Sequence, residues 1–280
     1  MLSLLSIFAL PTESQAPVSS NTDLDVLNYA LTLEHLEYEF YNQGLGKFDA
    51  ASFKDAGYAD KVYPLFQQIL AHEDTHVKTL TKVIESLNGT AVPPCEYDFK
   101  FTDVKGFVAT SKALETTGVS AYIGATKRIT DKTILTSAAS ILSVEARHAA
   151  FLNDISDTNP FPNAFDISLE DSEVVSIASQ FIVKCSFDLP KQFPVLTLSA
   201  GSGKVGDSVE VKTTAPLDNT SCLFLQGGGD NKFAQVIESK CAVPEGVSGE
   251  LFIILTTSST IEGLNSDTTV AGPASFEITK

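Results

Sequence analysis

Residues 66–87, FQQILAHEDTHVKTLTKVIESL, decide the fold of this chain. Apolar residues recur there at alternating steps of three and four, which is the pattern of a helix that buries one stripe. Glu73 and His76 stand on this stripe, where packing alone would favour leucine or isoleucine. The spacing Glu-x-x-His puts both side chains on one helical face, one turn apart. The segment therefore predicts a core helix that carries a buried polar pair.

Three other segments repeat this pattern with a polar residue on the stripe. We expect helices from Thr22 or Asp23 to Gln43, where Gly44 ends the first one, and from Pro64 to Asn88. Two more are expected at 103–127 and from Asp131 to before Asn159, and a fifth at 169–184. The first stripe reads Leu24, Leu27, Leu31, Glu34, Tyr38 and Tyr41. The third carries Glu115, and the fourth carries Glu145 and His148, a second Glu-x-x-His.

The lengths of the connections predict the topology. The third and fourth helices are joined by a few residues, so they should be antiparallel neighbours. The segment between the second and third helices has about fifteen residues, enough to run the length of a bundle when extended. One long crossover at this place is the ferritin-like topology. We therefore assign residues 22–187 to a ferritin-like four-helix bundle with a fifth helix.

The remainder of the chain has a different texture. From about residue 193, short β-rich runs such as 208–211, 222–225 and 251–255 alternate with Gly, Pro, Asn and Asp. Regular short strands with turn signals predict an antiparallel β-sandwich, immunoglobulin-like, over 193–280. Pro190 and Pro194 mark the joint. The fold class is thus multidomain, α then β. The run Gly227-Gly228-Gly229 lacks the Lys-Ser/Thr of a phosphate loop and predicts a turn.

The polar residues of the four stripes form a metal-binding set. Burying a bare carboxylate is costly. Four buried carboxylates therefore need a compensating interaction, and shared divalent cations supply one. Carboxylates and imidazoles suit iron and manganese alike. We therefore predict that two Fe or two Mn ions are held by Glu34, Glu73, His76, Glu115, Glu145 and His148. The hypothesis for function is redox chemistry on dioxygen or peroxide, of an oxidase, ferroxidase or catalase-like kind, with no catalytic residue assigned.

Two tyrosines add to the symmetry of this set. Tyr41 follows Glu34 by seven residues, and Tyr122 follows Glu115 by seven. Each tyrosine is interpreted either as a group that hydrogen-bonds a ligating carboxylate across the bundle or as an ordinary core aromatic.

Several other interpretations compete with the dinuclear one. Residues 72–76, HEDTH, also match the His-Glu-x-x-His motif of zinc proteases, with His72 and His76 as ligands. The zinc-protease interpretation leaves four of the six predicted metal ligands unexplained. His72 is therefore interpreted as exposed or as a group that supports a ligand. Glu37 and Glu39 are interpreted as flanking or exposed charges. The alternative function is a non-enzymatic secreted protein of stress or development with a structural or vestigial metal site.

Other features favour export from the cell. Residues 1–16 resemble a signal peptide, apolar over 2–10 and closed by Ser14-Gln15-Ala16. The four cysteines fit two disulfides, of which we favour Cys95–Cys185 and Cys222–Cys241, although four cysteines allow three pairings. Asn88 and Asn219 begin glycosylation sequons. The net charge of −16 argues against nucleic-acid and anionic-membrane partners, and no later stretch is long enough to span a bilayer.

Four stretches carry a resemblance to a known family: LNYALTLEHLEYEFY (27–41), AHEDTHV (71–77), SVEARHAAFL (143–152) and NPFPNAF (159–165). In them the chain resembles the ferritin-like domain of exported fungal proteins of sexual development and stress, related to plant desiccation-associated proteins. The resemblance covers about residues 22–190. It implies a di-iron or di-manganese carboxylate site with all six ligand positions filled, but no defined reaction. The C-terminal region lies outside it, which argues against a closed iron-storage shell and leaves a cell-wall or protein partner as an expectation.

Overall fold

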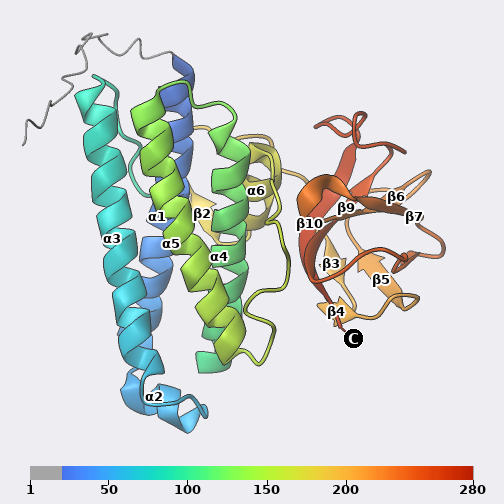
Figure 1. The fold of residues 1–280 in the computed structure, drawn as a ribbon, viewed down its shortest axis with the longest axis horizontal. Coiled ribbons are helices and arrows are strands. Elements are labelled where there is room, and N and C mark those ends of the chain that lie inside the picture. Colours follow the sequence, from blue (N-terminus) through green and yellow to red (C-terminus); the bar gives the residue numbers. More distant parts are fainter. Residues whose placement is uncertain (1–20, 280) are drawn as a thin grey trace, which may run out of the picture.

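The computed structural model describes residues 21–279, so the signal peptide predicted for residues 1–16 lies outside the described part. The chain first forms helices and then strands, as the sequence predicts (Figure 1). The helices are α1 (Asn21–Lys47), α2 (Ala50–Asp55), α3 (Val62–Ser86), α4 (Val104–Thr126), α5 (Lys132–Ile155) and α6 (Asp171–Ala178). No helix among the described residues combines the length and apolar composition that a membrane span requires.

Contacts at the two ends of α1 show the direction of α4, the third of the four long helices. Asp23, in the first turn of α1, accepts hydrogen bonds from the backbone nitrogen and the hydroxyl of Thr130, just past α4 (2.8 and 2.7 Å). Near the other end of α1, Gly44 lies against the ring of Phe107 in the first turn of α4. α4 therefore runs antiparallel to α1. Along their lengths α1 packs on α3, and α4 packs on α5.

The segment between α3 and α4 runs the length of the bundle. It begins at Gly89, which lies beside Leu24 at the start of α1. Close to its other end, the backbone oxygen of Phe101 accepts a hydrogen bond from Lys47, the last residue of α1 (2.6 Å). The single long crossover of the ferritin-like topology is therefore confirmed.

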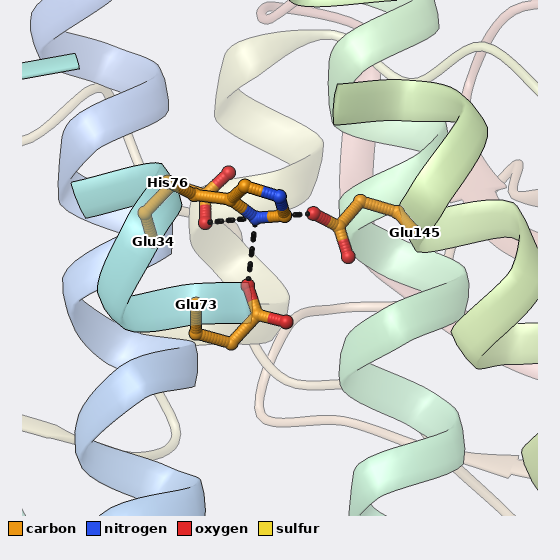
Figure 2. A group of neighbouring side chains, drawn as sticks. All are labelled: Glu34, Glu73, His76 and Glu145. Atoms are coloured by element: carbon orange, nitrogen blue, oxygen red, sulfur yellow. Dashed lines mark hydrogen bonds and ion pairs between the residues drawn. The ribbon is translucent and has the colours of Figure 1, made fainter. Parts of the chain in front are cut away.

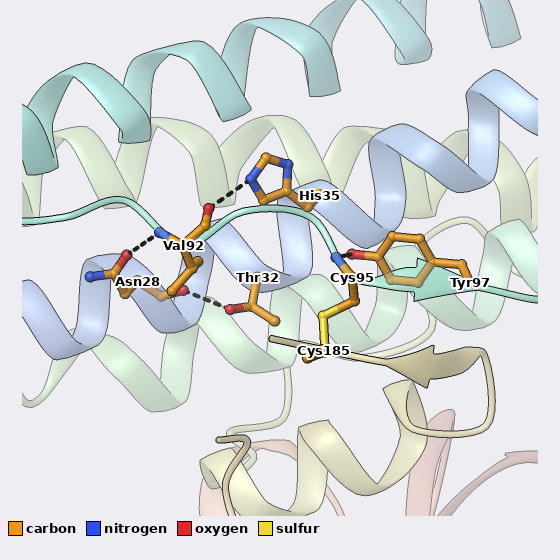
Figure 3. The surroundings of a disulfide bond; sticks show 7 residues. All are labelled: Asn28, Thr32, His35, Val92, Cys95, Tyr97 and Cys185. Atoms are coloured by element: carbon orange, nitrogen blue, oxygen red, sulfur yellow. Dashed lines mark hydrogen bonds between the residues drawn. A yellow bond between two sulfur atoms is a disulfide. The ribbon is translucent and has the colours of Figure 1, made fainter. Parts of the chain in front are cut away.

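Polar contacts and a disulfide hold this crossover against the bundle (Figure 3). The backbone nitrogen of Val92 donates to Asn28 Oδ1 (2.9 Å), and its carbonyl oxygen lies 3.1 Å from His35 Nε2. Cys95 is bonded to Cys185, and next to it β1 (Glu96–Tyr97) pairs antiparallel with β2 (Ile182–Lys184). The disulfide closes a loop that spans 90 residues. It thus connects the crossover to the segment that follows α6.

Two predicted helix ends are wrong, each for a tertiary reason, and one short helix was not predicted. Gly44 does not end α1, because its missing Cβ makes room for a ring: a Cβ there would lie 2.2 Å from Phe107 Cε2. The turn after it contains α2, which the pattern did not reveal, although Asp49 caps it by accepting from the nitrogen of Ser52. The fifth helix, α6, ends at Ala178 because the following residues pair with β1.

The C-terminal strands form two sheets, as expected for a sandwich. The strands are β3 (Thr197–Leu198), β4 (Ser202–Gly203), β5 (Ser208–Lys212), β6 (Ser221–Leu225), β7 (Lys232–Gln235), β8 (Lys240–Ala242), β9 (Glu250–Thr256) and β10 (Thr269–Ile278). Five of them are ordered β4-β10-β9-β6-β7, and three are ordered β3-β5-β8. Neighbouring strands pair antiparallel, as predicted, except β4 and β10, which pair parallel. The buried disulfide Cys222–Cys241 joins β6 of the first sheet to β8 of the second.

The strands do not form a separate core. α6 packs on α4 and on β10, so it lies between the bundle and the sheets (Figure 1). One apolar cluster continues from Val174 and Val175 of α6 to Phe252 of β9. The loop 159–165 adds polar contacts, because the Asn163 side chain exchanges two hydrogen bonds with the backbone of Glu250 (2.5 and 3.0 Å). The two parts therefore share an apolar interface and polar contacts.

The glycine run 227–229 is a turn, as predicted. It forms a short 3-10 turn in which Gly228 has a φ of 81°. A Cβ on Gly227 would lie 1.8 Å from the carbonyl oxygen of Phe165. The loop 159–165 therefore approaches this turn so closely that only glycine fits at position 227.

A stability prediction follows from the start of α6. Glu173 accepts a hydrogen bond from the backbone of Glu170 (2.8 Å), and burial raises the pKa of its carboxyl to about 7. The native state thus binds more protons than the unfolded chain between about pH 4.5 and 7, and the free energy of unfolding falls as pH rises through that range. Glu173→Gln keeps the acceptor oxygen and removes the charge. We expect it to be more stable than wild type at pH 8 by about 1 to 3 kcal/mol, and equally stable below pH 4.5.

Urea unfolding at both pH values measures this difference, with Glu262→Gln in an exposed loop as the control. An equal gain at acidic pH would contradict the assignment, because the benefit would then not come from removing a charge.

Candidate metal centre

Six side chains meet at the middle of the four long helices. They are Glu34 from α1, Glu73 and His76 from α3, Glu115 from α4, and Glu145 and His148 from α5. Their ligand atoms form two groups, each within 4.8 Å, and Glu73 and Glu145 belong to both groups. The four glutamates have no exposed surface, and the two histidines are buried. The structure thus brings together every residue of the predicted ligand set.

The first group surrounds one imidazole nitrogen (Figure 2). His76 Nδ1 lies 2.9 Å from Glu145 Oε1, 3.1 Å from Glu73 Oε2 and 3.2 Å from Glu34 Oε2. One nitrogen carries at most one proton, so it cannot satisfy three carboxylates by donation.

The second group repeats this arrangement around His148. Its Nδ1 lies 3.0 Å from Glu145 Oε2, and 3.3 Å from both Glu115 Oε2 and Glu73 Oε1. Glu73 and Glu145 therefore direct one oxygen to each histidine, whereas Glu34 and Glu115 each serve one histidine. This is the arrangement of two shared and two terminal carboxylates.

Two tyrosines connect the halves of the centre. The hydroxyl of Tyr41 on α1 donates to Glu115 Oε1 on α4, and the hydroxyl of Tyr122 on α4 donates to Glu34 Oε1 on α1, both at 2.5 Å. Each tyrosine thus holds the terminal carboxylate of the opposite helix. Neither is a purely apolar core aromatic.

The electrostatics of the centre favour added positive charge. Burial raises the pKa of Glu73 well above its usual value, and raises that of Glu145 to about 7. Burial opposes charge on His148 too, but the carboxylates of Glu115 and Glu145 outweigh it and raise its pKa to about 11. Glu73, Glu145 and His148 therefore retain protons strongly, whereas the charge of His148 outweighs burial at Glu115 and lowers the pKa of that carboxyl. A metal cation bound here would displace these protons, because carboxylate and imidazole ligands bind metals in their deprotonated forms.

The donor set fits two divalent cations. Glu34 Oε2, Glu73 Oε1 and Glu145 Oε1 are buried and accept no hydrogen bond. Unpaired buried carboxylate oxygens are costly, and a cation that they coordinate removes that cost. Hard oxygen donors together with imidazole nitrogens suit iron or manganese. The buried cluster is thus compatible with a metal site.

Glu37 is buried, although the sequence led us to expect a flanking or exposed charge. It is only 4% exposed, whereas Tyr38, which the predicted stripe included, is half-buried. A Cβ on Gly118 of α4 would lie 2.8 Å from Glu37 Oε1, so the glycine leaves space for this carboxyl. Burial, together with the nearby Glu115, raises the pKa of Glu37 well above its usual value. A further carboxyl, held largely neutral, therefore stands beside the metal-binding groups. Glu39, by contrast, lies at the surface side of α1, where Gln43 donates to it (3.4 Å).

His72 supports the centre from outside. It is exposed, and its Nδ1 lies 3.0 Å from the outer nitrogen, Nε2, of His148, with the two rings stacked. It belongs to neither group of candidate ligands. The zinc-protease interpretation, which needs His72 and His76 on one ion, therefore has no support in this geometry.

Comparison with known proteins agrees with this architecture. Residues 22–158 match the family model described as a ferritin-like domain. The helical part of the chain is a ferritin-like domain. The resemblance found in the sequence is thereby confirmed at the level of the domain.

This ferritin-like domain also has individual relatives. Protein rds1 of Schizosaccharomyces pombe is 27% identical over 183 residues, which cover 64% of this chain and 45% of that protein. The match therefore spans about half the length of this curated relative. A conserved hypothetical protein of Mycobacterium tuberculosis has a TM-score of 0.42 at 17% identity, covering 52% of this chain and 97% of its own. A ferritin-like, diiron-carboxylate protein structure of Bacillus anthracis has a TM-score of 0.41 at 18% identity, covering 48% and 94%.

A substitution of one shared carboxylate tests the ligand set. We expect Glu73→Gln to lower bound metal from two equivalents to one or fewer, because Glu73 contacts both histidines. The metal-free variant should be more stable than metal-free wild type by roughly 1 to 3 kcal/mol of unfolding free energy, since a buried carboxylate is gone. It should therefore unfold at a higher temperature. Elemental analysis and thermal unfolding with and without Mn²⁺ measure both effects. Glu85→Gln, exposed on the same helix, is the matched control. Full metal content in Glu73→Gln would show that the ligand set is wrong.

A second substitution tests the tyrosine contact. Tyr122→Phe removes the donor to Glu34 without touching a ligand atom. We expect metal affinity to fall about 10- to 100-fold, as is usual when a partner of a ligand is lost. Titration of the metal-free protein with Mn²⁺ measures this, and Tyr38→Phe, outside the centre, should leave affinity unchanged. Equal affinities in all three proteins would make Tyr122 a packing residue.

Proposed function

We propose that this protein binds two iron or two manganese ions and uses them for redox chemistry on dioxygen or peroxide. The observation that supports this most directly is the pair of carboxylates, Glu73 and Glu145, that face both histidines and that each keep one oxygen without a hydrogen bond. Two such ions, when bound, supply one electron each, enough with two protons to reduce dioxygen to hydrogen peroxide, or hydrogen peroxide to two water molecules.

The roles of the chain's own residues follow from their positions. Glu73 and Glu145 would be shared between the ions, while Glu34 with His76 and Glu115 with His148 would complete each site. Tyr41 and Tyr122 fix the orientation of the terminal carboxylates. Apolar residues one turn away close the centre above and below, namely Ile69, Leu80, Ile141 and Leu152, all buried. This shell keeps bulk water from the reacting atoms.

We further propose that the protein works outside the cell. Both disulfides are built into the fold, and the one in the sheets is fully buried. Disulfides of this kind are typical of oxidising compartments. Asn88 and Asn219, the first residues of the two sequons, are exposed and thus accessible to glycosylation.

The function is tested by metal analysis followed by turnover. The full chain, purified without chelators, should contain about two equivalents of iron or manganese. Its anaerobically reduced form should consume dioxygen or hydrogen peroxide. The double variant that combines Glu73→Gln with Glu145→Gln should consume neither. One equivalent of zinc would revive the protease interpretation. No metal after anaerobic reconstitution would refute the proposal, and metal without turnover would favour the non-enzymatic alternative.

A further inference from the structure

The bundle encloses a small apolar cavity next to the metal centre. Its volume is about 80 Å³, and α1, α3, α4 and α5 all contribute to its wall. Ala30, Leu80 and Ile141 line it, each one turn from a candidate ligand on its own helix: Glu34, His76 and Glu145 respectively. One turn is about 5.4 Å of helix. The cavity therefore adjoins the group of ligands around His76, not the group around His148.

Few polar atoms of the wall are available to a guest. The hydroxyl of Tyr122, whose side chain lines the cavity, donates to Glu34. The hydroxyls of Thr79 and Ser137 donate to carbonyl oxygens of their own helices, at Thr75 and Thr133 (2.7 and 3.1 Å). A buried water needs two to four polar partners, and cavities that lack them stay dry and accept apolar guests. The wall thus favours a molecule that makes no hydrogen bonds.

The cavity also approaches the surface. Thr79 on α3 and Thr133 on α5 line it and are both exposed. α3 packs mainly on α1, and α5 mainly on α4, so this side of the bundle is where the two helix pairs meet. An entry between α3 and α5 would therefore not pass the charged centre.

We propose that this cavity takes up dioxygen and holds it beside the Glu34–His76 side of the centre. A volume of about 80 Å³ has room for a diatomic molecule, since one water occupies roughly 30 Å³ in the liquid. Hydrogen peroxide, which forms strong hydrogen bonds, gains nothing from such a wall. The inference rests on the proposed function and narrows its oxidant to dioxygen.

Xenon tests the cavity independently of any metal. Crystals of the metal-free full chain, pressurised with xenon, should show one atom between Leu80 and Ile141. Ala138→Leu, which fills the cavity from its buried wall, should abolish this site. Ala139→Leu, the exposed neighbour on the same helix, should retain it. If wild type binds no xenon there, the cavity is not an uptake site and the inference fails, whatever the metal content.

Oxidation kinetics of the reduced, metal-loaded protein test the choice of oxidant. Ala138→Leu should slow the reaction with dioxygen by about tenfold or more, equivalent to at least about 1.4 kcal/mol of activation free energy. Its reaction with hydrogen peroxide should be unchanged, as should both reactions of Ala139→Leu. Ser137→Phe, at the half-buried mouth of the cavity, should have the same effects as Ala138→Leu. This second variant keeps the test valid if Ala138→Leu does not fold. Equal slowing with both oxidants, or xenon binding without any effect on the dioxygen rate, would overturn the proposal.

Discussion

Four carboxylates converge on two imidazole nitrogens at a place that water does not reach, and the rest of the helical domain is arranged around this fact. A buried carboxylate without a partner is strongly disfavoured, so the long helices gain no stability from holding these groups together. Tyr41 and Tyr122 compensate for part of this cost by donating across the bundle. Three further oxygens, Glu34 Oε2, Glu73 Oε1 and Glu145 Oε1, accept no hydrogen bond. These unpaired oxygens make the buried cluster compatible with bound cations.

The two halves of the centre are related by an approximate symmetry, but they are not equivalent. Glu34 and Glu115 occupy matching positions, yet the residue three further on is Glu37 in α1 and Gly118 in α4, and the glycine leaves room for the glutamate. The apolar cavity adjoins the His76 group of ligands, whereas the exposed His72 contacts His148. One half therefore faces an apolar space and the other reaches solvent through an imidazole. Two bound ions would differ in their surroundings and hence in their reactivity.

The centre can be predicted from the sequence because its polar residues interrupt an apolar pattern. Features that depend on contacts between distant residues cannot be predicted from that pattern. The six candidate ligands, the crossover and most strands follow from periodicity and connection length. Glu37 was missed because alternating steps of three and four, extended from Leu31, reach Tyr38, whereas a helix of 3.6 residues per turn brings Glu37 inward before Tyr41. The match between Glu37 and Gly118 was the available signal. Gly44 was misassigned because its reason, the Phe107 ring, is distant in sequence. The early end of α6 likewise depends on strand pairing with the crossover.

The C-terminal strands constrain how the centre can be reached. They pack through α6 on α4, and the loop 159–165 joins them to the bundle through Asn163. The apolar cavity approaches the surface between α3 and α5, and in Figure 1 α3 lies on the side of the bundle away from the strands. A molecule bound to the strands would therefore leave this entrance open. Because one apolar cluster extends from α6 into the sheets, such a molecule would also bear on α4, the helix that supplies Glu115 and Tyr122. The strands thus pack, through α6, against the helix that supplies Glu115, while the proposed entrance for the oxidant lies on another side of the bundle.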